Sequence, residues 1–92
     1  MKPRSILIRG GEVVTNEAVS RQDVLIEEER IRAVGESASS QADTVIDAGG
    51  LLVLPGAVDT HVHLNDVFMG TVSVHDYYTG TLGAAYGGVT SI

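Results

Sequence analysis

The stretch LPGAVDTHVHL (residues 54–64) is decisive because it places two histidines two positions apart, shortly after a Pro-Gly break. In an extended strand, side chains at i and i+2 point to the same face. A strand over residues 57–64 would therefore direct Asp59, His61 and His63 one way and the mostly apolar residues the other way. Two Cα atoms at this spacing lie roughly 6 to 7 Å apart, so both imidazoles can reach one divalent ion at bond lengths of about 2.0 to 2.1 Å. The pattern predicts a pair of metal ligands, His61 and His63.

The same spacing also occurs in histidines that are ordinary surface or core residues with partners elsewhere. The position of the pair favours ligands, because active sites of (β/α)₈ barrels are built from residues at the carboxyl ends of strands. Two roles stay open for Asp59. It can orient an imidazole by a hydrogen bond, as carboxylates beside metal sites do, or it can be a plain exposed carboxylate on the strand.

Residues 5–54, which precede the break, consist of short apolar runs separated by turn residues, a pattern typical of β-structure. A two-residue hairpin turn prefers Asn-Gly or Asp-Gly, so a longer or irregular loop is expected at Glu27-Glu28-Glu29. The polar residues 36–43 predict a surface loop. The expected elements are strands at 6–8 and 13–14 separated by Gly10-Gly11, a turn at Asn16-Glu17, a hairpin over 23–35, and strands at 44–46 and 51–54.

Residues 55–92 show a different pattern, which predicts the start of a βαβ arrangement: a strand over 57–64, a helix over 73–87 and a strand from 89. We expect Ser73 to cap the helix, with Asp76 at the third position, and Gly87-Gly88 to end it. Gly80 and Gly83 inside the helix each cost about 1 kcal/mol relative to alanine, which is tolerated where a helix packs close to a neighbouring backbone. We expect a domain boundary at Pro55-Gly56, separating residues 1–54 from 55–92, and a chain that stops within a strand.

The composition excludes several classes of function. Twelve acidic against six basic residues give a net charge of -6, which repels nucleic acid. No cysteine is present, so a metal would be held by histidine and carboxylate, and a reducing cytoplasm is the expected location. The longest apolar stretch, residues 51–58, is far shorter than the roughly 20 residues that span a bilayer, and the apolar run at 6–8 is too short for a signal peptide. We therefore expect no export, no membrane segment and no nucleic-acid partner.

Residues 54–64 resemble the P-G-x-x-D-x-H-x-H signature of the amidohydrolase superfamily. The strands expected before them resemble the small β-domain that precedes the barrel in that superfamily. Residues 70–90 are most similar to hydantoinases and dihydropyrimidinases, whereas residues 63–66 look more like allantoinases, and Val67 stands where both groups usually have proline. The resemblance implies a mixed α/β fold: strands of a small β-sandwich-type domain, then the first β-α unit of a (β/α)₈ TIM barrel, incomplete within these 92 residues.

The resemblance also implies a function, namely the N-terminal segment of a metal-dependent cyclic amidohydrolase that cleaves a C–N bond of a hydantoin or dihydropyrimidine. His61 and His63 would bind the more buried ion of a two-zinc centre, whose other ligands and catalytic base lie outside this sequence. The chain alone is then expected to be inactive. The hydantoinase resemblance has Phe68 and Met69 line the substrate pocket, and the allantoinase resemblance has Asn65 and Asp66 contact the substrate. Simple packing of Phe68 and Met69, and turn formation by Asn65 and Asp66, are the alternatives.

A different class of function stays open beside the hydrolase. A non-catalytic module could use exposed strand edges to form a homo-oligomer, or to complement the remainder of an enzyme. A simple metal-binding β-protein is a third possibility. We expect His75 and the Glu27–Glu29 run to be solvated.

Overall fold

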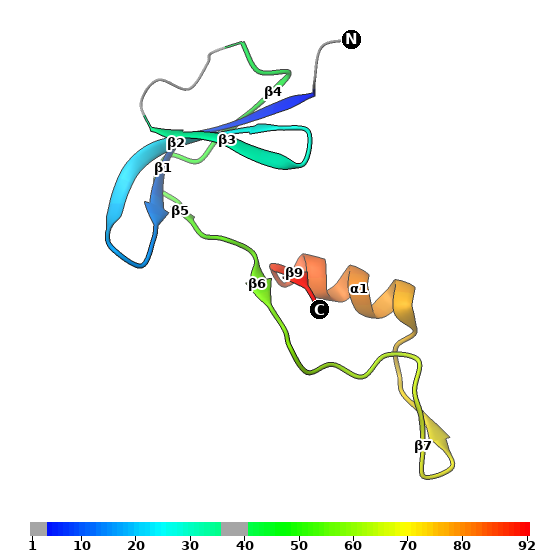
Figure 1. The fold of residues 1–92 in the computed structure, drawn as a ribbon. Helices are drawn as coiled ribbons and strands as arrows, with labels where there is room; N and C mark the ends of the chain where they lie inside the picture. Colours follow the sequence, from blue (N-terminus) through cyan, green and yellow to red (C-terminus); the bar gives the residue numbers. More distant parts are fainter. Residues whose placement is uncertain (1–3, 36–40) are drawn as a thin grey trace. The chain divides into compact units, whose positions relative to one another are not determined.

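The computed structural model describes residues 4–35 and 41–92, and its contacts divide the chain into two compact units, Met1–Leu54 and Pro55–Ile92. Figure 1 shows the elements of each unit. The first unit contains β1 (Ser5–Val14), β2 (Val19–Glu27), β3 (Arg30–Gly35), β4 (Thr44–Asp47) and β5 (Leu52–Val53). The second contains β6 (Ala57–Val58), β7 (Val67–Phe68), β8 (Thr71–Val72), α1 (Tyr77–Tyr86) and β9 (Val89–Ser91). The expectation of a strand-rich chain followed by a helix is confirmed.

The first unit is one sheet in the order β3-β2-β1-β4, in which β5 also pairs with β1. β1 runs antiparallel to β2, and β2 antiparallel to β3, whereas β4 and β5 both pair with β1 in parallel. A small apolar core forms because alternate residues of β1 face the same side. Its buried members are Leu7, Val13, Val24 and Ala48.

The predicted strand break at Gly10-Gly11 is wrong, because β1 continues through both glycines. The register with β2 shifts between Ile8 and Gly11, and Gly10 adopts a φ of 75°, as in a glycine-containing β-bulge. The Gly10 N–H donates to Asp23 Oδ1 at 2.9 Å. At Gly11, a Cβ would overlap the Val53 side chain and lie 3.0 Å from the Cβ of Ala48. The two glycines therefore serve a bulge and close packing within one strand.

The predicted hairpin over residues 23–35 is confirmed, but the longer or irregular loop expected at its tip is wrong. Glu27 pairs with Arg30, which leaves a two-residue turn at Glu28 and Glu29. Glu28 adopts a φ of 55°, which is uncommon for a residue with a side chain. Its N–H donates to the carbonyl of Arg4 at 2.8 Å, and its Oε1 accepts from the Arg4 N–H at 3.0 Å. These two hydrogen bonds to Arg4, the residue that precedes β1, offset the backbone cost.

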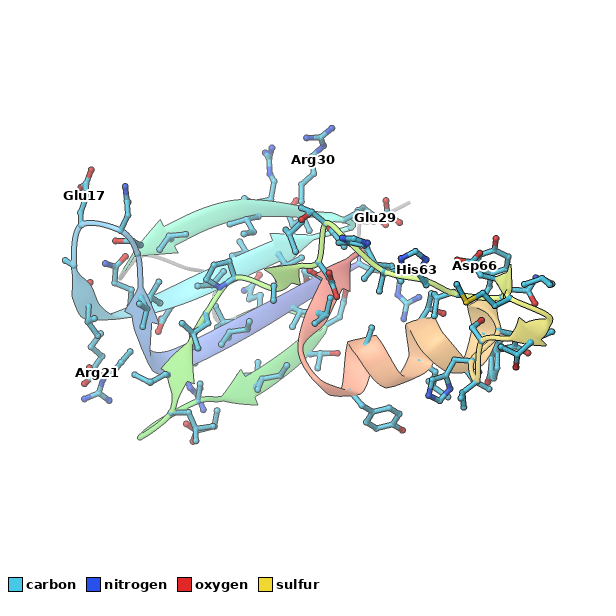
Figure 2. All side chains as sticks on the ribbon, turned by 90° about the horizontal axis from the view of Figure 1, so that it is seen from below. Glu17, Arg21, Glu29, Arg30, His63 and Asp66 are labelled. Carbon is cyan, nitrogen blue, oxygen red and sulfur yellow. The ribbon has the colours of Figure 1, made fainter. Side chains whose placement is uncertain are left out.

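The other expected features of this unit are found close to their predicted positions. The turn at Asn16-Glu17 joins β1 to β2, and the Thr15 N–H donates to the Ala18 carbonyl at 2.9 Å. Glu17 at this turn and Arg30 at the next one lie at opposite ends of the sheet (Figure 2). The strands expected at 44–46 and 51–54 correspond to β4 and β5. Most of the expected polar loop at 36–43 lies outside the described residues.

The second unit pairs β6 in parallel with β9, with α1 between them in the chain, so the expected β-α-β order is present. The strand predicted over residues 57–64 is wrong in extent, because β6 ends at Val58. The last backbone bond toward β9 runs from the Asp59 N–H to the Ser91 carbonyl, at 2.8 Å. Residues 60–66 pair with no strand in the part of the chain that the structure describes. A separate short hairpin, β7–β8, precedes the helix.

The helix begins later than predicted, and its N-cap is Asp76 rather than Ser73. The Asp76 Oδ1 accepts from the Thr79 N–H at 2.8 Å and from the Thr79 hydroxyl at 2.9 Å. These bonds, the backbone one first, hold the pKa of Asp76 below its ordinary value of 3.8. The Ser73 hydroxyl is engaged elsewhere, with the Asp66 N–H and the His75 carbonyl. The predicted end at Gly87 is confirmed by its N–H bonds to the carbonyls of Gly83 and Ala84.

The close approach of a neighbouring backbone expected at the helix glycines is not found among the described residues, but a side chain packs against one of the two. A Cβ on Gly80 would overlap the Leu64 side chain, whereas a Cβ on Gly83 would meet no described atom within 4 Å. In the described residues, no helix has the length and apolar character needed to cross a membrane.

Candidate metal-binding site

His61 and His63 lie in the irregular segment that follows β6, not on a strand as predicted. Their imidazoles nevertheless converge, since the two Nε2 atoms are 3.1 Å apart. The ring centroids lie 5.1 Å apart with the planes tilted by 52°. The geometry expected from the i, i+2 spacing is therefore present, although no strand pairing supports it. The metal-binding role of the pair stays a prediction.

The distance between the two nitrogens fits a shared ion. Ligand atoms 3.1 Å apart, each bonded at about 2.0 to 2.1 Å, subtend about 100° at the ion, close to a tetrahedral angle. The same distance also suits a hydrogen bond in which one neutral ring donates to the other. The two arrangements exclude each other, because an ion needs the lone pair of both nitrogens.

Asp66 is the carboxylate that contacts an imidazole of the pair. Its Oδ2 lies 2.9 Å from His63 Nδ1, and Figure 2 shows both side chains on the segment before β7. Metal-binding histidines commonly donate their second ring N–H to a carboxylate in this way. The side chains are 69% and 49% exposed, so as an ion pair the contact contributes little to stability. The sequence predicts Asp66 as a substrate contact or a turn former, and the i, i+3 spacing from His63 is the signal for this further contact.

Asp59 has a different position from the one that a carboxylate orienting an imidazole would need. Its Oδ1 accepts from the backbone N–H of His61 at 3.1 Å. The contact closes a short turn of the kind that Asp side chains form with the backbone two residues on. Asp59 thus restrains the backbone at His61, whereas Asp66 contacts the imidazole ring of His63.

Of the residues predicted to contact substrate, Asp66 lies against the His63 ring, whereas Asn65 and Met69 are placed differently. Asn65 adopts a φ of 56° and its N–H donates to the His75 carbonyl at 2.9 Å, which is a turn-forming role. Phe68 ends β7, and Met69 forms a two-residue turn with Gly70, with its side chain 89% exposed. A groove of about 530 Å³ lies beside the site, and in the described chain neither Asn65 nor Met69 lines it. Its lining residues are His63, Asp66, Val67, Thr71, Val72 and Ser73.

The site is incomplete within the described residues. They contain no group of three or more histidine, aspartate and glutamate side chains placed to hold an ion. Catalytic zinc sites ordinarily have three protein ligands and a water molecule. His61 and His63 would supply two nitrogen ligands to a site of this kind.

The comparisons with known proteins agree with the resemblance, although no family model matches the chain. Rat dihydropyrimidinase is 45% identical over 92 residues, and D-hydantoinase of Geobacillus stearothermophilus is 41% identical over 86 residues. These matches cover 95% and 94% of this chain and 18% of each relative. Human dihydropyrimidinase-related protein 5, whose name states a relationship rather than an activity, is 43% identical and 16% covered.

Solved structures give the same result. Dihydropyrimidinase from Brevibacillus agri superposes with a TM-score of 0.86 at 44% identity, over 94% of this chain and 19% of that one. L-Hydantoinase from Arthrobacter aurescens gives 0.60 at 30% identity, over 67% of this chain and 14% of that one. The chain is thus related to a class of hydrolases that includes both hydantoinase types. Within that class it is a homologue of dihydropyrimidinases and D-hydantoinases over nearly its whole length, and it spans about a fifth of theirs.

Proposed function

We propose that this chain supplies two metal ligands to a metal-dependent cyclic amidohydrolase, which opens a C–N bond in a ring of the hydantoin or dihydropyrimidine type. The observation that carries the proposal is the 3.1 Å separation of the His61 and His63 Nε2 atoms, in a chain homologous to such hydrolases along 95% of its length. The expected substrate is a small cyclic amide, and the expected location is the cytoplasm.

The proposal includes an assignment of the two units. Residues 1–54 would form part of a small β-domain, and residues 55–92 the first strand and helix of a (β/α)₈ barrel. The parallel pairing of β6 with β9 across α1 supports this assignment, because such a barrel repeats a strand-helix unit with parallel neighbours. His61 and His63 follow β6 directly, at the strand end where barrel active sites are built.

In this function, His61 and His63 would hold an ion through Nε2. Zinc is the expected metal, with two ions in a complete site by resemblance. When bound, zinc lowers the pKa of a water molecule and polarises the amide carbonyl. Each imidazole would bind through the lone pair of an unprotonated Nε2. Since the described residues contain no third ligand, the chain alone is expected to show negligible hydrolysis.

A chimera tests the proposal directly. The segment of the Geobacillus D-hydantoinase that matches this chain at 41% identity is replaced by residues 1–92, and hydantoin hydrolysis is measured with zinc present. The matched control carries His61→Ala and His63→Ala in the same chimera. A His75→Ala chimera serves as a second control, because His75 is the remaining histidine and its described hydrogen bonds use its backbone carbonyl.

Activity in the chimera and its loss in the double variant would support the proposal. Equal activity with and without the two histidines, in chimeras of equal stability, would contradict it. A chimera that folds and binds zinc but does not turn over either ring would remove the hydrolase assignment and leave only metal binding.

A second candidate is a non-catalytic module that associates with another copy or with the rest of an enzyme. Exposed apolar side chains of the second unit favour it, since α1 contains no buried residue and Val74, Tyr77, Tyr78 and Tyr86 are each at least 65% exposed. Apolar surface of this extent is unusual for an isolated soluble monomer. Sedimentation velocity over a range of concentrations distinguishes the cases: a strict monomer at all concentrations contradicts self-association.

A further inference from the structure

We infer that Asp66 is a positioning residue that fixes the His63 ring in the Nδ1–H tautomer and thereby turns its Nε2 lone pair toward His61. The relevance of this tautomer to an ion rests on the proposed function, whereas the tautomer itself can be measured without metal. The inference depends on three relationships, which are the contact from carboxylate to ring, the direction of the other ring nitrogen, and the way in which Asp66 is held.

The contact defines where the proton lies. An ionised carboxylate can only accept hydrogen bonds, so the 2.9 Å contact between Asp66 Oδ2 and His63 Nδ1 requires a proton on Nδ1. A neutral imidazole carries a single N–H, so the Nε2 of His63 is then an acceptor. That atom is the one that lies 3.1 Å from His61 Nε2. In the absence of an ion, His61 can donate its Nε2–H to it. Binding of an ion to both Nε2 atoms would require His61 to carry its proton on Nδ1 instead.

Asp66 is held by the base of the β7–β8 hairpin. Its N–H donates to the Ser73 hydroxyl at 2.9 Å, and its carbonyl accepts from the Ser73 N–H at 2.8 Å. The preceding residue, Asn65, adopts the left-handed conformation that Asn tolerates better than most residues, and this turns the chain just before Asp66. A side chain on a backbone restrained in this way returns to His63 at i-3 at little further entropic cost.

Asp59 does not perform this role, although it lies closer in sequence to His61. Its carboxylate accepts a backbone N–H and contacts neither ring in the described structure. The difference supplies a matched control, because Asp59→Ala and Asp66→Ala remove the same group from the same segment. Only the second change removes the acceptor of a ring N–H.

The test uses the 92-residue chain and two-bond ¹H–¹⁵N spectra of its three histidines, at a pH about two units above the ordinary histidine value near 6.5. We expect the His63 ring of the parent chain to show the Nδ1–H pattern. Asp66→Ala should shift it to the mixed pattern of a free imidazole, while Asp66→Asn, whose amide oxygen still accepts, should retain part of the bias. Asp59→Ala should leave the His63 pattern unchanged. An identical His63 pattern in the parent chain and in Asp66→Ala, with the remaining spectrum native, overturns the inference.

Zinc titration of the same samples separates this inference from the proposed function. Loss of a carboxylate partner typically lowers metal affinity about 10–100-fold. Because both side chains of this pair are exposed, we expect a loss of about tenfold. A tautomer change on Asp66→Ala without any zinc response at His61 and His63 contradicts the metal assignment and leaves the positioning role intact. Zinc binding by both histidines with no change of tautomer or affinity in Asp66→Ala contradicts the positioning role alone.

Discussion

The Leu64 side chain occupies the space that a Cβ on Gly80 would fill. Leu64 directly follows His63 in sequence, so the irregular segment that carries both histidines is packed against α1 at this glycine. The contact explains a helix-interior glycine that costs about 1 kcal/mol relative to alanine. It also ties the position of the histidine segment to the helix in the absence of strand pairing beyond Asp59.

We predict different effects for alanine at the two helix glycines. Gly83→Ala should stabilise the second unit by up to about 1 kcal/mol, because it gains helix propensity and its Cβ meets no described atom within 4 Å. Gly80→Ala should lose that gain, because overpacking against Leu64 costs typically about 1–3 kcal/mol. Urea unfolding followed by far-UV circular dichroism measures both. Equal stabilisation by the two substitutions would contradict the Leu64 contact.

A second prediction concerns the helix cap and pH. Hydrogen bonds from Thr79 hold the pKa of Asp76 below its ordinary 3.8. The unfolded chain therefore binds the proton more readily, so this contribution is fully present above about pH 4 and is lost as the pH falls through the lower, folded value. Helical ellipticity between pH 7 and 2 should decline less steeply in Asp76→Asn, which keeps a capping oxygen without a titrating group. Parallel acid profiles for the parent chain and Asp76→Asn would contradict the contribution of the Asp76 cap. Ser73→Ala is the control and should leave the pH profile of the helix unchanged.

Much of the fold was predictable because it depends on local patterns. Alternation and turn residues located β2, β3, β4 and β5, and Gly87 located the end of the helix. The features that were predicted wrongly depend on contacts between residues that are distant in sequence. Gly10-Gly11 is typical of a strand break, but here the Asp23 carboxylate accepts a hydrogen bond from the Gly10 N–H and the strand continues through a bulge. A glutamate is an unfavourable residue for a tight turn, but here the backbone N–H and the carboxylate of Glu28 are both hydrogen bonded to the backbone of Arg4.

The site was predictable in part for the same reason. The i, i+2 spacing correctly brings His61 and His63 together, but strand periodicity assigned the carboxylate role to Asp59, which shares their expected face. The chain leaves the strand after Val58 and turns at Asn65, so the carboxylate that reaches a ring is Asp66. An alternating strand pattern does not reveal that Asn65, between His63 and Asp66, adopts a left-handed backbone conformation.

The packing of the first unit gives a third prediction. Gly11→Ala should destabilise the sheet by about 1–3 kcal/mol, because the added Cβ overlaps Val53 and approaches Ala48 to 3.0 Å. Val53→Ala in the same chain should recover part of the loss, since it removes the methyl group that the new Cβ meets. Urea unfolding of the four combinations gives the coupling energy. A coupling near zero would show that Gly11 is required for a reason other than this contact.

The final prediction concerns the histidine pair. His61→Ala and His63→Ala should each abolish most of the zinc affinity of the chain, because the remaining imidazole loses the partner nitrogen 3.1 Å away. His75→Ala should have little effect, since the described contacts of His75 with Asn65 and Ser73 use its backbone carbonyl. Isothermal titration calorimetry of the parent chain and the three alanine variants measures these affinities. Zinc affinity that is equal in the parent chain and in both alanine variants would place the ion elsewhere and remove the physical basis for a metal site at this segment.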